Sequence, residues 1–281
     1  MSPLSIDLSL LGAKHHETEL HIIFDNKECL AKLSRPKEQR IVWEKRWSSP
    51  HGPVVVESSI NDRAWFESIA RELDQLVGAT APQIIVVLPD PEFKHVRMQM
   101  EEIPGDRESL QKLIRWRLQE EFYIDTNTMD TDYHFEKSDE ITVFTIEQSL
   151  LNGVVQTFKK YNLLVAAFQP YAVYLLERTQ TDAYGVNFIL HNEGYFSYGM
   201  VDKDQSLRLF QSEYVDVNDS SRSKNLYKRA RRDFISASLS RSEEEQLILW
   251  LGRGEPDSDV GNIPGFKLQL ATEAARQESA S

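Results

Sequence analysis

The sequence predicts an α/β protein in which one arrangement of elements occurs twice, with an additional α/β unit inserted into the first copy. Three observations lead to this prediction. Short apolar runs bounded by turn residues indicate strands, longer stretches with apolar residues three and four apart indicate helices, and the order of strands, helix and strand recurs in the second half. The chain has 281 residues, enough for about two domains with cores of their own.

The first half opens with a predicted antiparallel meander followed by a helix. Turn signals such as Asp25-Asn26 separate its apolar segments. The expected strands are residues 4–11, 19–24, 28–33 and 41–47. The expected helix is residues 61–77, with Asn61 as its N-cap and Gly78 at its end. Its apolar face is expected to consist of Trp65, Ile69, Leu73 and Leu76.

The middle of the chain alternates between strands and helices. Residues 84–88 form a continuous apolar run closed by Pro89, which predicts a strand buried on both faces. Val96, Met98 and Met100 alternate in the next expected strand. A helix is expected next at 106–122, with Leu110, Leu113, Ile114 and Leu118 on its inner face. The elements expected after this helix are a strand at 141–146, a helix at 147–161, and residues 163–168 leading to a short helix at 171–176.

The second half repeats this layout after a break at residues 179–184. Three strands are expected at residues 186–190, 195–201 and 206–211, followed by a helix at 224–239 and a final strand at 246–251. The last residues, 273–281, are expected to form a frayed tail. No short-period internal repeat is present in the sequence.

Charge, cysteine content and hydropathy limit the classes of function. The formal net charge of −12 argues against nucleic acid as the main partner. Cys29 is the single cysteine, so an intrachain disulfide and a cysteine zinc site are excluded, and a reducing compartment is favoured. We expect Cys29 to be a buried, inert thiol. The N-terminus lacks a signal-peptide pattern and no apolar run is long enough to span a bilayer, so we expect membrane association only through a partner.

One succession of segments in the middle of the chain resembles a known family. The segments are 84–89 (IIVVLP), Val96-Arg97-Met98, Glu102-Ile103-Pro104, 113–122 (LIRWRLQEEF) with Asp130, Tyr133 and Phe135, then 142–147 (TVFTIE), 154–163 (VVQTFKKYNL) and 168–176 (FQPYAVYLL). This succession resembles the pilus-assembly protein PilM family and the similar cytoplasmic part of GspL-like type II secretion proteins. It covers about residues 82–178.

The resemblance implies an actin-like (ribonuclease H-like) two-lobe fold. Residues 1–178 would form the first lobe, with an inserted α/β subdomain at about 90–164, and residues 179–281 a shortened second lobe. The implied role is that of a cytoplasmic scaffold, peripheral to the inner membrane through a partner, in a type IV pilus or type II secretion machine. It would bind the cytoplasmic tail of an inner-membrane protein in a groove beside the inserted subdomain, and contact the assembly ATPase.

An ATP site on such a fold needs two hairpins in which an acidic residue is followed by glycine, because glycine lets backbone N–H groups approach phosphates. The candidate cofactor-binding residues are Asp7, Ser9, Gly12 and Lys14 for the first hairpin, Asn192 and Gly194 for the second, and Gly252 and Gly254 on the adenosine side. Leu8 stands where glycine is expected, His191 stands where an acid is expected, and Glu193 would repel phosphate. We therefore expect ordinary turns and no cofactor, with ATP and Mg²⁺ binding by an active ATPase or sugar-kinase relative as the alternative.

Other catalytic patterns are absent from the sequence. It contains no Gly-x-x-x-x-Gly-Lys phosphate loop and no Gly-x-Ser-x-Gly elbow. His15, His16 and His21 lack suitably spaced acidic or cysteine partners, so we expect no metal site. The acidic residues at 120–121 and at 130 and 132 are expected to be solvated. We expect a binding protein and not an enzyme, with a stand-alone regulatory module as a further alternative.

Two surface features remain open. The cluster from Lys228 to Arg232 is basic and lies on a predicted helix, so it fits either anionic headgroups or an acidic partner, or else pairs with local acids such as those at 243–245. The tryptophans at positions 43, 47, 65 and 250 are expected in the core, whereas Trp116 between Arg115 and Arg117 is a candidate partner anchor.

Overall fold

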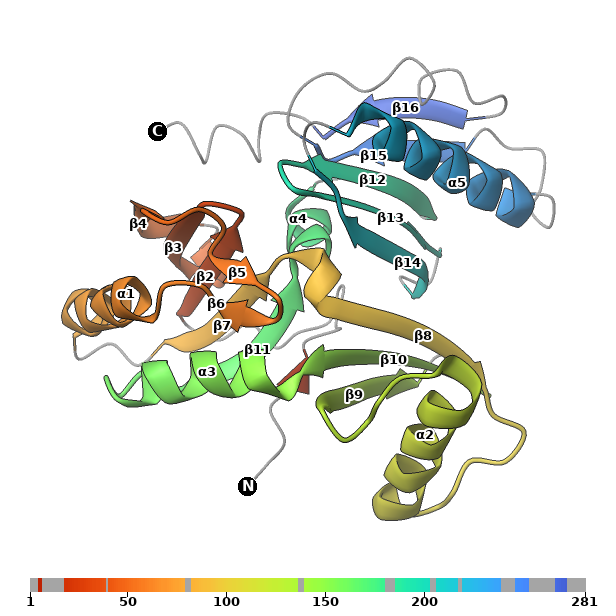
Figure 1. The fold of residues 1–281 in the computed structure, drawn as a ribbon, viewed down its shortest axis with the longest axis horizontal. Coiled ribbons are helices and arrows are strands. Elements are labelled where there is room, and N and C mark those ends of the chain that lie inside the picture. Colours follow the sequence, from red (N-terminus) through yellow and green to blue (C-terminus); the bar gives the residue numbers. More distant parts are fainter. Residues whose placement is uncertain are drawn as a thin grey trace. The chain divides into compact units, whose positions relative to one another are not determined.

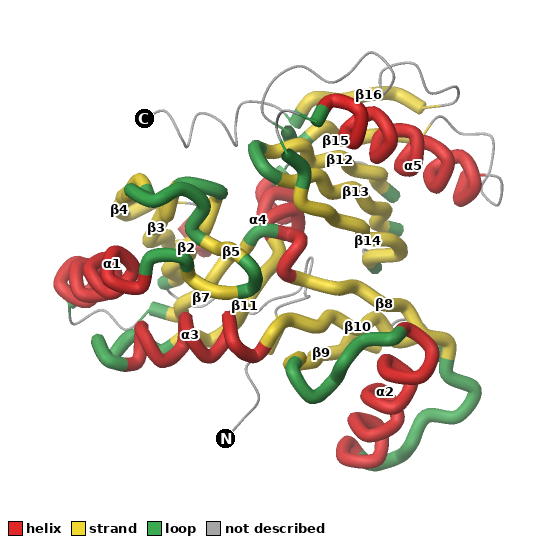
Figure 2. Tube along the Cα trace, in the orientation of Figure 1, coloured by secondary structure: helices red, strands yellow, loops and turns green. Residues whose placement is uncertain are grey.

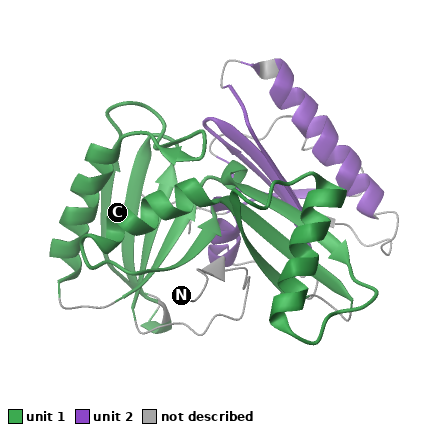
Figure 3. Ribbon diagram, turned by 60° about the horizontal axis from the view of Figure 1, so that its bottom comes forward, with its two compact units in different colours: residues 1–9, 13–170 green, residues 10–12, 171–281 purple. Residues whose placement is uncertain are grey.

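The computed structural model forms two compact units (Figures 1 and 3). The first consists chiefly of Ala13–Pro170 and the second chiefly of Tyr171–Ser281. The structure describes residues 5–6, 18–38, 40–78, 82–135, 139–179, 185–202, 206–216, 219–238, 246–252 and 266–271. The division falls at the start of helix α4 (Tyr171–Arg178), whereas the sequence suggested a boundary at the end of that helix.

A six-stranded mixed sheet is the centre of the first unit. Its order is β1-β11-β7-β2-β3-β4. The strands are β1 (Ser5–Ile6), β2 (Glu19–Asp25), β3 (Glu28–Arg35), β4 (Arg40–Ser48), β7 (Gln83–Leu88) and β11 (Val165–Pro170). The shorter elements are η1 (Pro36–Glu38), β5 (Val55–Val56), β6 (Ser59–Ile60) and η2 (Asp90–Glu92). β2, β3 and β4 form an antiparallel meander, whereas β2, β7, β11 and β1 run parallel.

Two helices, α1 (Arg63–Val77) and α3 (Gln148–Lys159), pack on this sheet. Phe66 of α1 makes edge-to-face contacts with Phe24 of β2 and Phe158 of α3, with ring centroids 5.4 and 5.0 Å apart. The apolar run of β7 is buried, as its sequence predicted. These aromatic contacts join strand and helices into one core.

The boundary and inner face of α1 differ from the prediction by one residue. Asp62, and not Asn61, is the N-cap, because its carboxylate accepts the backbone N–H of Trp65 at 2.9 Å. The Asn61 amide instead donates to two loop carbonyls. The buried face is Phe66, Ile69, Ala70, Leu73 and Val77. Trp65 is only half-buried and Leu76 is exposed, so the expected face was wrong at both ends.

The inserted unit is a three-stranded antiparallel sheet with helix α2 (Arg107–Phe122) on one face (Figure 2). Its strands are β8 (Phe93–Gln99), β10 (Glu140–Glu147) and β9 (Met129–Phe135), in the order β8-β10-β9. Val96, Met98 and Met100 pack under Leu110, Ile114 and Leu118, and Leu113 is partly buried beside them. Strand β9 was not predicted, because polar residues occupy the face that points away from this core.

The second unit contains a five-stranded sheet in the order β14-β13-β12-β15-β16, with helix α5 (Ser220–Ser238) packed on it. Its strands are β12 (Val186–Asn192), β13 (Tyr195–Val201), β14 (Leu207–Tyr214), β15 (Gln246–Trp250) and β16 (Phe266–Leu270). The prediction that residues 246–251 are the last strand was wrong, because β16 pairs in parallel with β15. Helix α5 also begins before residue 224.

The two sheets share one connectivity. In each, an antiparallel meander is followed by a helix and then by two parallel strands, so β2, β3, β4, β7 and β11 correspond to β12, β13, β14, β15 and β16. Residues 4–11 therefore do not open the meander as expected. Within them, Ser5–Ile6 forms the edge strand β1, which pairs in parallel with β11. The first hairpin of the meander is the one between β2 and β3.

Candidate functional site

The shared connectivity identifies the two hairpins at which an actin-like fold would bind phosphates. They join the first and second strands of each meander, β2 to β3 and β12 to β13. In the first hairpin Asp25 pairs with Glu28, and in the second Asn192 pairs with Tyr195, which leaves a turn of two residues in each. A turn this short presents few successive backbone N–H groups to an anion.

The first hairpin is also bonded to its own chain. The carbonyls of Asn26 and Lys27 accept the N–H groups of Val54 and Ser49, at 2.6 and 2.7 Å. Asn26 has a positive φ of 44°, so an asparagine supplies the conformation for which glycine is the usual residue. The neighbouring Glu28 pairs with Arg46. The loop therefore occupies the two carbonyl groups of the turn, whereas a phosphate would bind backbone N–H groups.

The second hairpin is closed by its own side chains. Asn192 is buried, and its Nδ2 donates to the Tyr195 hydroxyl at 3.2 Å, while its Oδ1 accepts the N–H of Glu193 at 2.9 Å. Gly194 has a φ of 91°, which the turn requires. By connectivity Asn192 corresponds to Asp25, so the second hairpin carries an amide where the first carries an acid. Gly194 is explained by the turn without a ligand.

Gly252 follows β15, at the position expected to face adenosine. A Cβ atom placed on it would lie 2.7 Å from the His191 carbonyl oxygen and 3.0 Å from the Trp250 ring. His191 Nδ1 is 2.8 Å from the Tyr227 hydroxyl, and Tyr227 stacks on Trp250 with ring centroids 6.3 Å apart. Close packing against strand β12 and these aromatic rings is therefore sufficient reason for glycine at this position.

The remaining predicted site residues, Asp7, Ser9, Gly12, Lys14 and Gly254, lie outside the described residues. Only Asn192, Gly194 and Gly252 of the predicted set are placed, and all three belong to the second unit. Within the second unit they lie at the connected ends of β12, β13 and β15: Leu251, the neighbour of Gly252, donates its N–H to the Ile189 carbonyl of β12.

Sequence reasoning missed a group of buried polar residues at the carboxyl ends of the parallel strands in the first unit. They are Asp25 at the end of β2, Asp90 and Glu92 after β7, and Gln169 in β11. In the sheet register Ile23, Val87 and Gln169 lie in one row, so these side chains follow three neighbouring strands. Ligands of α/β sheets commonly bind at this edge. Among the described residues, however, no cluster of three or more His, Cys, Asp or Glu side chains fits a metal ion.

Buried titratable groups elsewhere serve packing. Burial raises the pKa of the Cys29 thiol far above its ordinary value, so the thiol stays protonated and inert, in line with the prediction for it. Burial, followed by its hydrogen bond to Asp233, raises the pKa of Tyr198. The Tyr198 hydroxyl donates to Asp233 Oδ2 at 2.7 Å, which ties α5 to β13.

Exposed apolar side chains concentrate on the inserted unit. Five of the eleven large hydrophobic residues that are exposed in the described part of the chain lie between β8 and β10, although this segment is about a fifth of the sequence. They are Ile103, Trp116, Phe122, Tyr123 and Phe135. Exposed aromatic residues gathered in one region mark interaction surfaces more often than scattered ones do.

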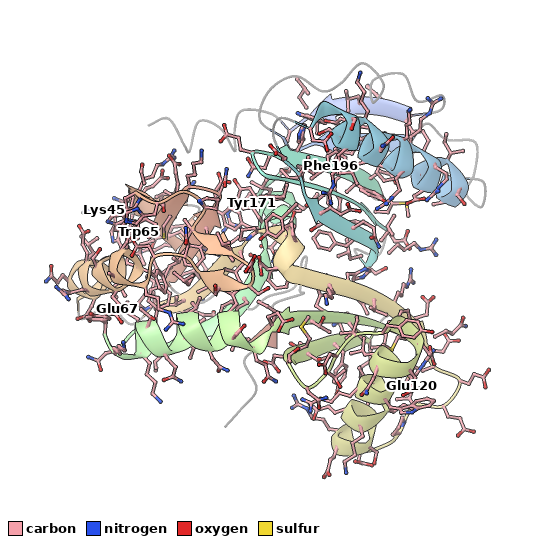
Figure 4. All side chains as sticks on the ribbon, viewed as in Figure 1. Lys45, Trp65, Glu67, Glu120, Tyr171 and Phe196 are labelled. Carbon is pink, nitrogen blue, oxygen red and sulfur yellow. The ribbon has the colours of Figure 1, made fainter. Side chains whose placement is uncertain are left out.

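Helix α2 carries the most exposed of these side chains on the face opposite its core residues. Trp116 is 57% exposed and Tyr123, which ends the helix with a left-handed φ of 55°, is 90% exposed. Glu120 lies between them, one turn after Trp116, and is also exposed (Figure 4). Of the four tryptophans expected in the core only Trp250 is buried, and the expectation was wrong for positions 43, 47 and 65, which are partly exposed. Trp116 is on the surface, as a partner anchor requires. We call Trp116, Glu120 and Tyr123 the α2 face.

Comparison with solved structures identifies the fold. No protein-family model matches the sequence, and no curated protein matches it. The structure is similar to a chain of the "PilM-PilN type IV pilus biogenesis complex", with a TM-score of 0.65 and 14% identity over 92% of this chain and 90% of that one. It is also similar to the cytoplasmic domain of EpsL, an inner membrane component of the type II secretion system of Vibrio cholerae, with a TM-score of 0.54 and 9% identity over 94% of each chain.

A third solved structure has an actin-like ATPase fold. It is a protein with "actin-like ATPase fold and unknown function" from Bacteroides thetaiotaomicron, with a TM-score of 0.50 and 10% identity over 98% of this chain and 99% of that one. The predicted fold class is therefore confirmed: this chain has an actin-like fold. Its likeness to PilM and to a type II secretion protein, expected from residues 82–178, extends over nearly the whole chain at the level of fold.

Proposed function

We propose that this chain is a scaffold for assembly of a type IV pilus or type II secretion machine, and that it binds the cytoplasmic tail of an inner-membrane protein. The likeness to PilM and EpsL supports this setting. No described helix combines the length and apolar character needed to cross a membrane, so in this proposal the membrane protein is the partner. The assembly ATPase is the second partner that the resemblance implies.

The observation that carries the proposal is the pair of two-residue hairpins on an actin-like frame. Each hairpin is bonded to its own chain, through Ser49 and Val54 in the first unit and through Asn192 in the second. A frame without phosphate loops supports partner binding better than phosphoryl transfer, because that chemistry depends on positioning and neutralising phosphate charge. We therefore propose that the chain binds and does not catalyse.

The α2 face is the surface that we assign to the tail. Trp116 and Tyr123 are large aromatic anchors of the kind that dominate interface energies. Glu120 has no ion-pair partner in the described part of the chain, and its negative charge suits lysine and arginine. Cytoplasmic segments next to membrane spans are enriched in these basic residues. The expected ligand is therefore a short tail with basic residues beside an apolar one.

Peptide binding tests the proposal. The probe is a synthetic peptide of the cytoplasmic tail of the PilN-like or type II secretion inner-membrane protein from the same organism, followed by fluorescence anisotropy with the full chain. We expect micromolar binding that weakens about tenfold or more in Trp116→Ala, since hot-spot truncations cost above 1 kcal/mol. Leu164→Ala removes an apolar side chain that is more exposed than Trp116 but lies outside the inserted unit, and it is expected to leave binding unchanged. Absence of binding by the unmodified chain contradicts the proposal.

An ATP-binding protein is the alternative. The buried Asp25, Asp90, Glu92 and Gln169 favour it, because they lie at the carboxyl ends of the strands, where ligands of α/β sheets commonly bind. Calorimetry with Mg-ATP separates the two proposals, since a scaffold with closed hairpins gives no binding heat, whereas a functional nucleotide site binds in the micromolar range.

A further inference from the structure

Helix α5 is strongly basic although the protein is acidic. Its 19 residues contain six lysines and arginines and a single acidic residue, Asp233, whereas the whole chain carries a net charge of −12. A positive surface on a negative protein requires an explanation, because local charge of this density is usually paired or used. Only three of the six basic side chains of α5 form ion pairs within the described part of the chain.

One flank of α5 is neutralised by the neighbouring strand. Glu213 of β14 forms ion pairs with both Arg222 and Arg229, which are seven residues apart and therefore on the same side of the helix. Arg232, three residues after Arg229, forms an ion pair with the adjacent Asp233. These three arginines are explained by the packing of the second unit.

The other flank carries three exposed cations without a partner. Lys224, Lys228 and Arg231 are spaced by four and three residues, so they form one line along the helix, about 10 Å long. None of them forms an ion pair or hydrogen bond within the parts of the chain that the structure describes. The acids at 243–245, which were candidate partners, lie outside those parts. We call these three residues the basic stripe.

The helix under the basic stripe is firmly held. Leu226, Tyr227, Ala230 and Phe234 are buried against the sheet, and the Tyr198–Asp233 hydrogen bond adds a polar tie. The stripe residues belong to a helix already fixed by its core, so a ligand that binds them does not need to order the backbone. None of the large hydrophobic residues on the described part of α5 is exposed.

We propose that the basic stripe binds anionic phospholipid headgroups of the membrane surface. Protein interfaces have an apolar centre, which this flank of α5 lacks, whereas adsorption to headgroups needs positive charge alone. The net charge of −12 disfavours nucleic acid as the polyanion. The proposal agrees with the proposed function, which brings the chain to a membrane, but it concerns a different surface and a different ligand.

The stripe orients the protein and does not anchor it. Each lysine or arginine near an anionic bilayer strengthens binding by about fivefold, so three together contribute about 10²-fold. Because the attraction acts within a Debye length of about 8 Å at physiological salt, acidic residues elsewhere on the molecule are largely screened. The affinity should fall steeply when salt is raised.

Vesicle flotation with the full chain tests the proposal. The probes are vesicles of phosphatidylcholine alone and of phosphatidylcholine with a third of phosphatidylglycerol. We expect binding to the anionic vesicles only, lost in high salt, and weakened about 10²-fold in K224E/K228E/R231E. The control K37E/K94E/K159E makes the same change of net charge at exposed lysines of the first unit and should bind as the unmodified chain does.

Each other outcome overturns the proposal. These outcomes are absence of binding to anionic vesicles, equal loss in both triple variants, and tighter binding to random duplex DNA than to vesicles at equal phosphate concentration. The triple alanine variant repeats the test if the glutamates prevent folding, which circular dichroism reports, and salt dependence of the unmodified chain needs no variant. Because no partner protein is present, failure here leaves the tail-peptide result unaffected.

Discussion

The two sheets of this protein have the same connectivity, but they carry different residues and insertions at equivalent positions. After β7, the first unit contains an inserted α/β unit with exposed aromatic residues. At the first hairpin, Asp25 is an acid in one sheet and its counterpart Asn192 is an amide in the other. The hairpins themselves are equally short. Both units have the packing of an actin-like fold, and in both the turn of the first hairpin is only two residues long.

This comparison separates structural from functional explanations of individual residues. Gly194 and Gly252 match a nucleotide-site pattern in sequence, yet a turn and a close approach account for them in the structure. The α2 face has no comparable structural explanation, because its aromatic side chains point away from the core. Substitutions should therefore affect stability at the first set of positions and binding at the second.

The largest effect is expected at Gly199 of β13. A Cβ atom there would lie 2.4 Å from the Leu209 carbonyl oxygen and 2.5 Å from the Phe188 ring, so Gly199→Ala should cost about 3 kcal/mol or more of unfolding free energy. Gly153 in α3 has open space around it, so Gly153→Ala should stabilise by about 0.5–1 kcal/mol. Urea denaturation of both variants checks the contrast, and equal midpoints would contradict it.

A smaller loss is expected for Gly252→Ala. The contact with the His191 carbonyl is 2.7 Å, and the neighbouring Trp250 ring is less crowded, so we expect about 1–3 kcal/mol. Thermal unfolding with and without Mg-ATP measures it. Our account predicts the same loss in both conditions, and stabilisation of the unmodified chain by Mg-ATP would show instead that this glycine serves a ligand.

Introducing an acid into the second hairpin should also lower the stability of the protein. Asn192→Asp removes the amide donor to Tyr195 and places a charge in a buried site, at a cost of about 1–3 kcal/mol. Asn162→Asp, at an exposed turn with a φ of 58°, is the control and should change stability by less than about 0.5 kcal/mol. Urea midpoints report both, and a neutral Asn192→Asp would mean that the hairpin accommodates an acid at this position.

The smallest effect concerns the cap of α2 in the inserted unit. The N–H of Ser109 donates to Asp106 and holds the pKa of that carboxyl below its ordinary value. Since the pKa is lowered by folding, the stability that it contributes is present above the unfolded pKa and is lost as pH falls through the folded pKa. Asp106→Asn keeps an acceptor without this titration, so its urea midpoint should fall less than that of the unmodified chain on acidification.

The sequence was most informative where one periodicity dominated. The buried run of β7 and the alternating Val96, Met98 and Met100 were predicted because burial alone determines such patterns. Strand β9 was missed because the polar residues Asp130, Asp132 and His134 occupy one of its faces, although Met129, Thr131 and Tyr133 alternate with them on the other. The alternation typical of a strand was present, but the polar residues obscured it.

The candidate site was less predictable because it depends on strand pairing. The apolar residues at 4–11 indicate a strand but do not say which neighbour it joins, so the first hairpin was sought one strand too early. For the same reason Asp25, Asp90 and Gln169, which are far apart in sequence, were not recognised as residues of one sheet edge. Local patterns predict elements, and only pairing brings distant residues together.

Titration calorimetry of the full chain with Mg-ATP measures nucleotide binding directly. Our proposal is that this protein has an actin-like frame in which the turns of both phosphate hairpins are too short to bind nucleotide. It predicts no heat of binding at nucleotide concentrations up to about 1 mM, where a weak site would still be detected. Saturable binding in the micromolar range would contradict it and would return the buried acids of the first unit to the role of a working site.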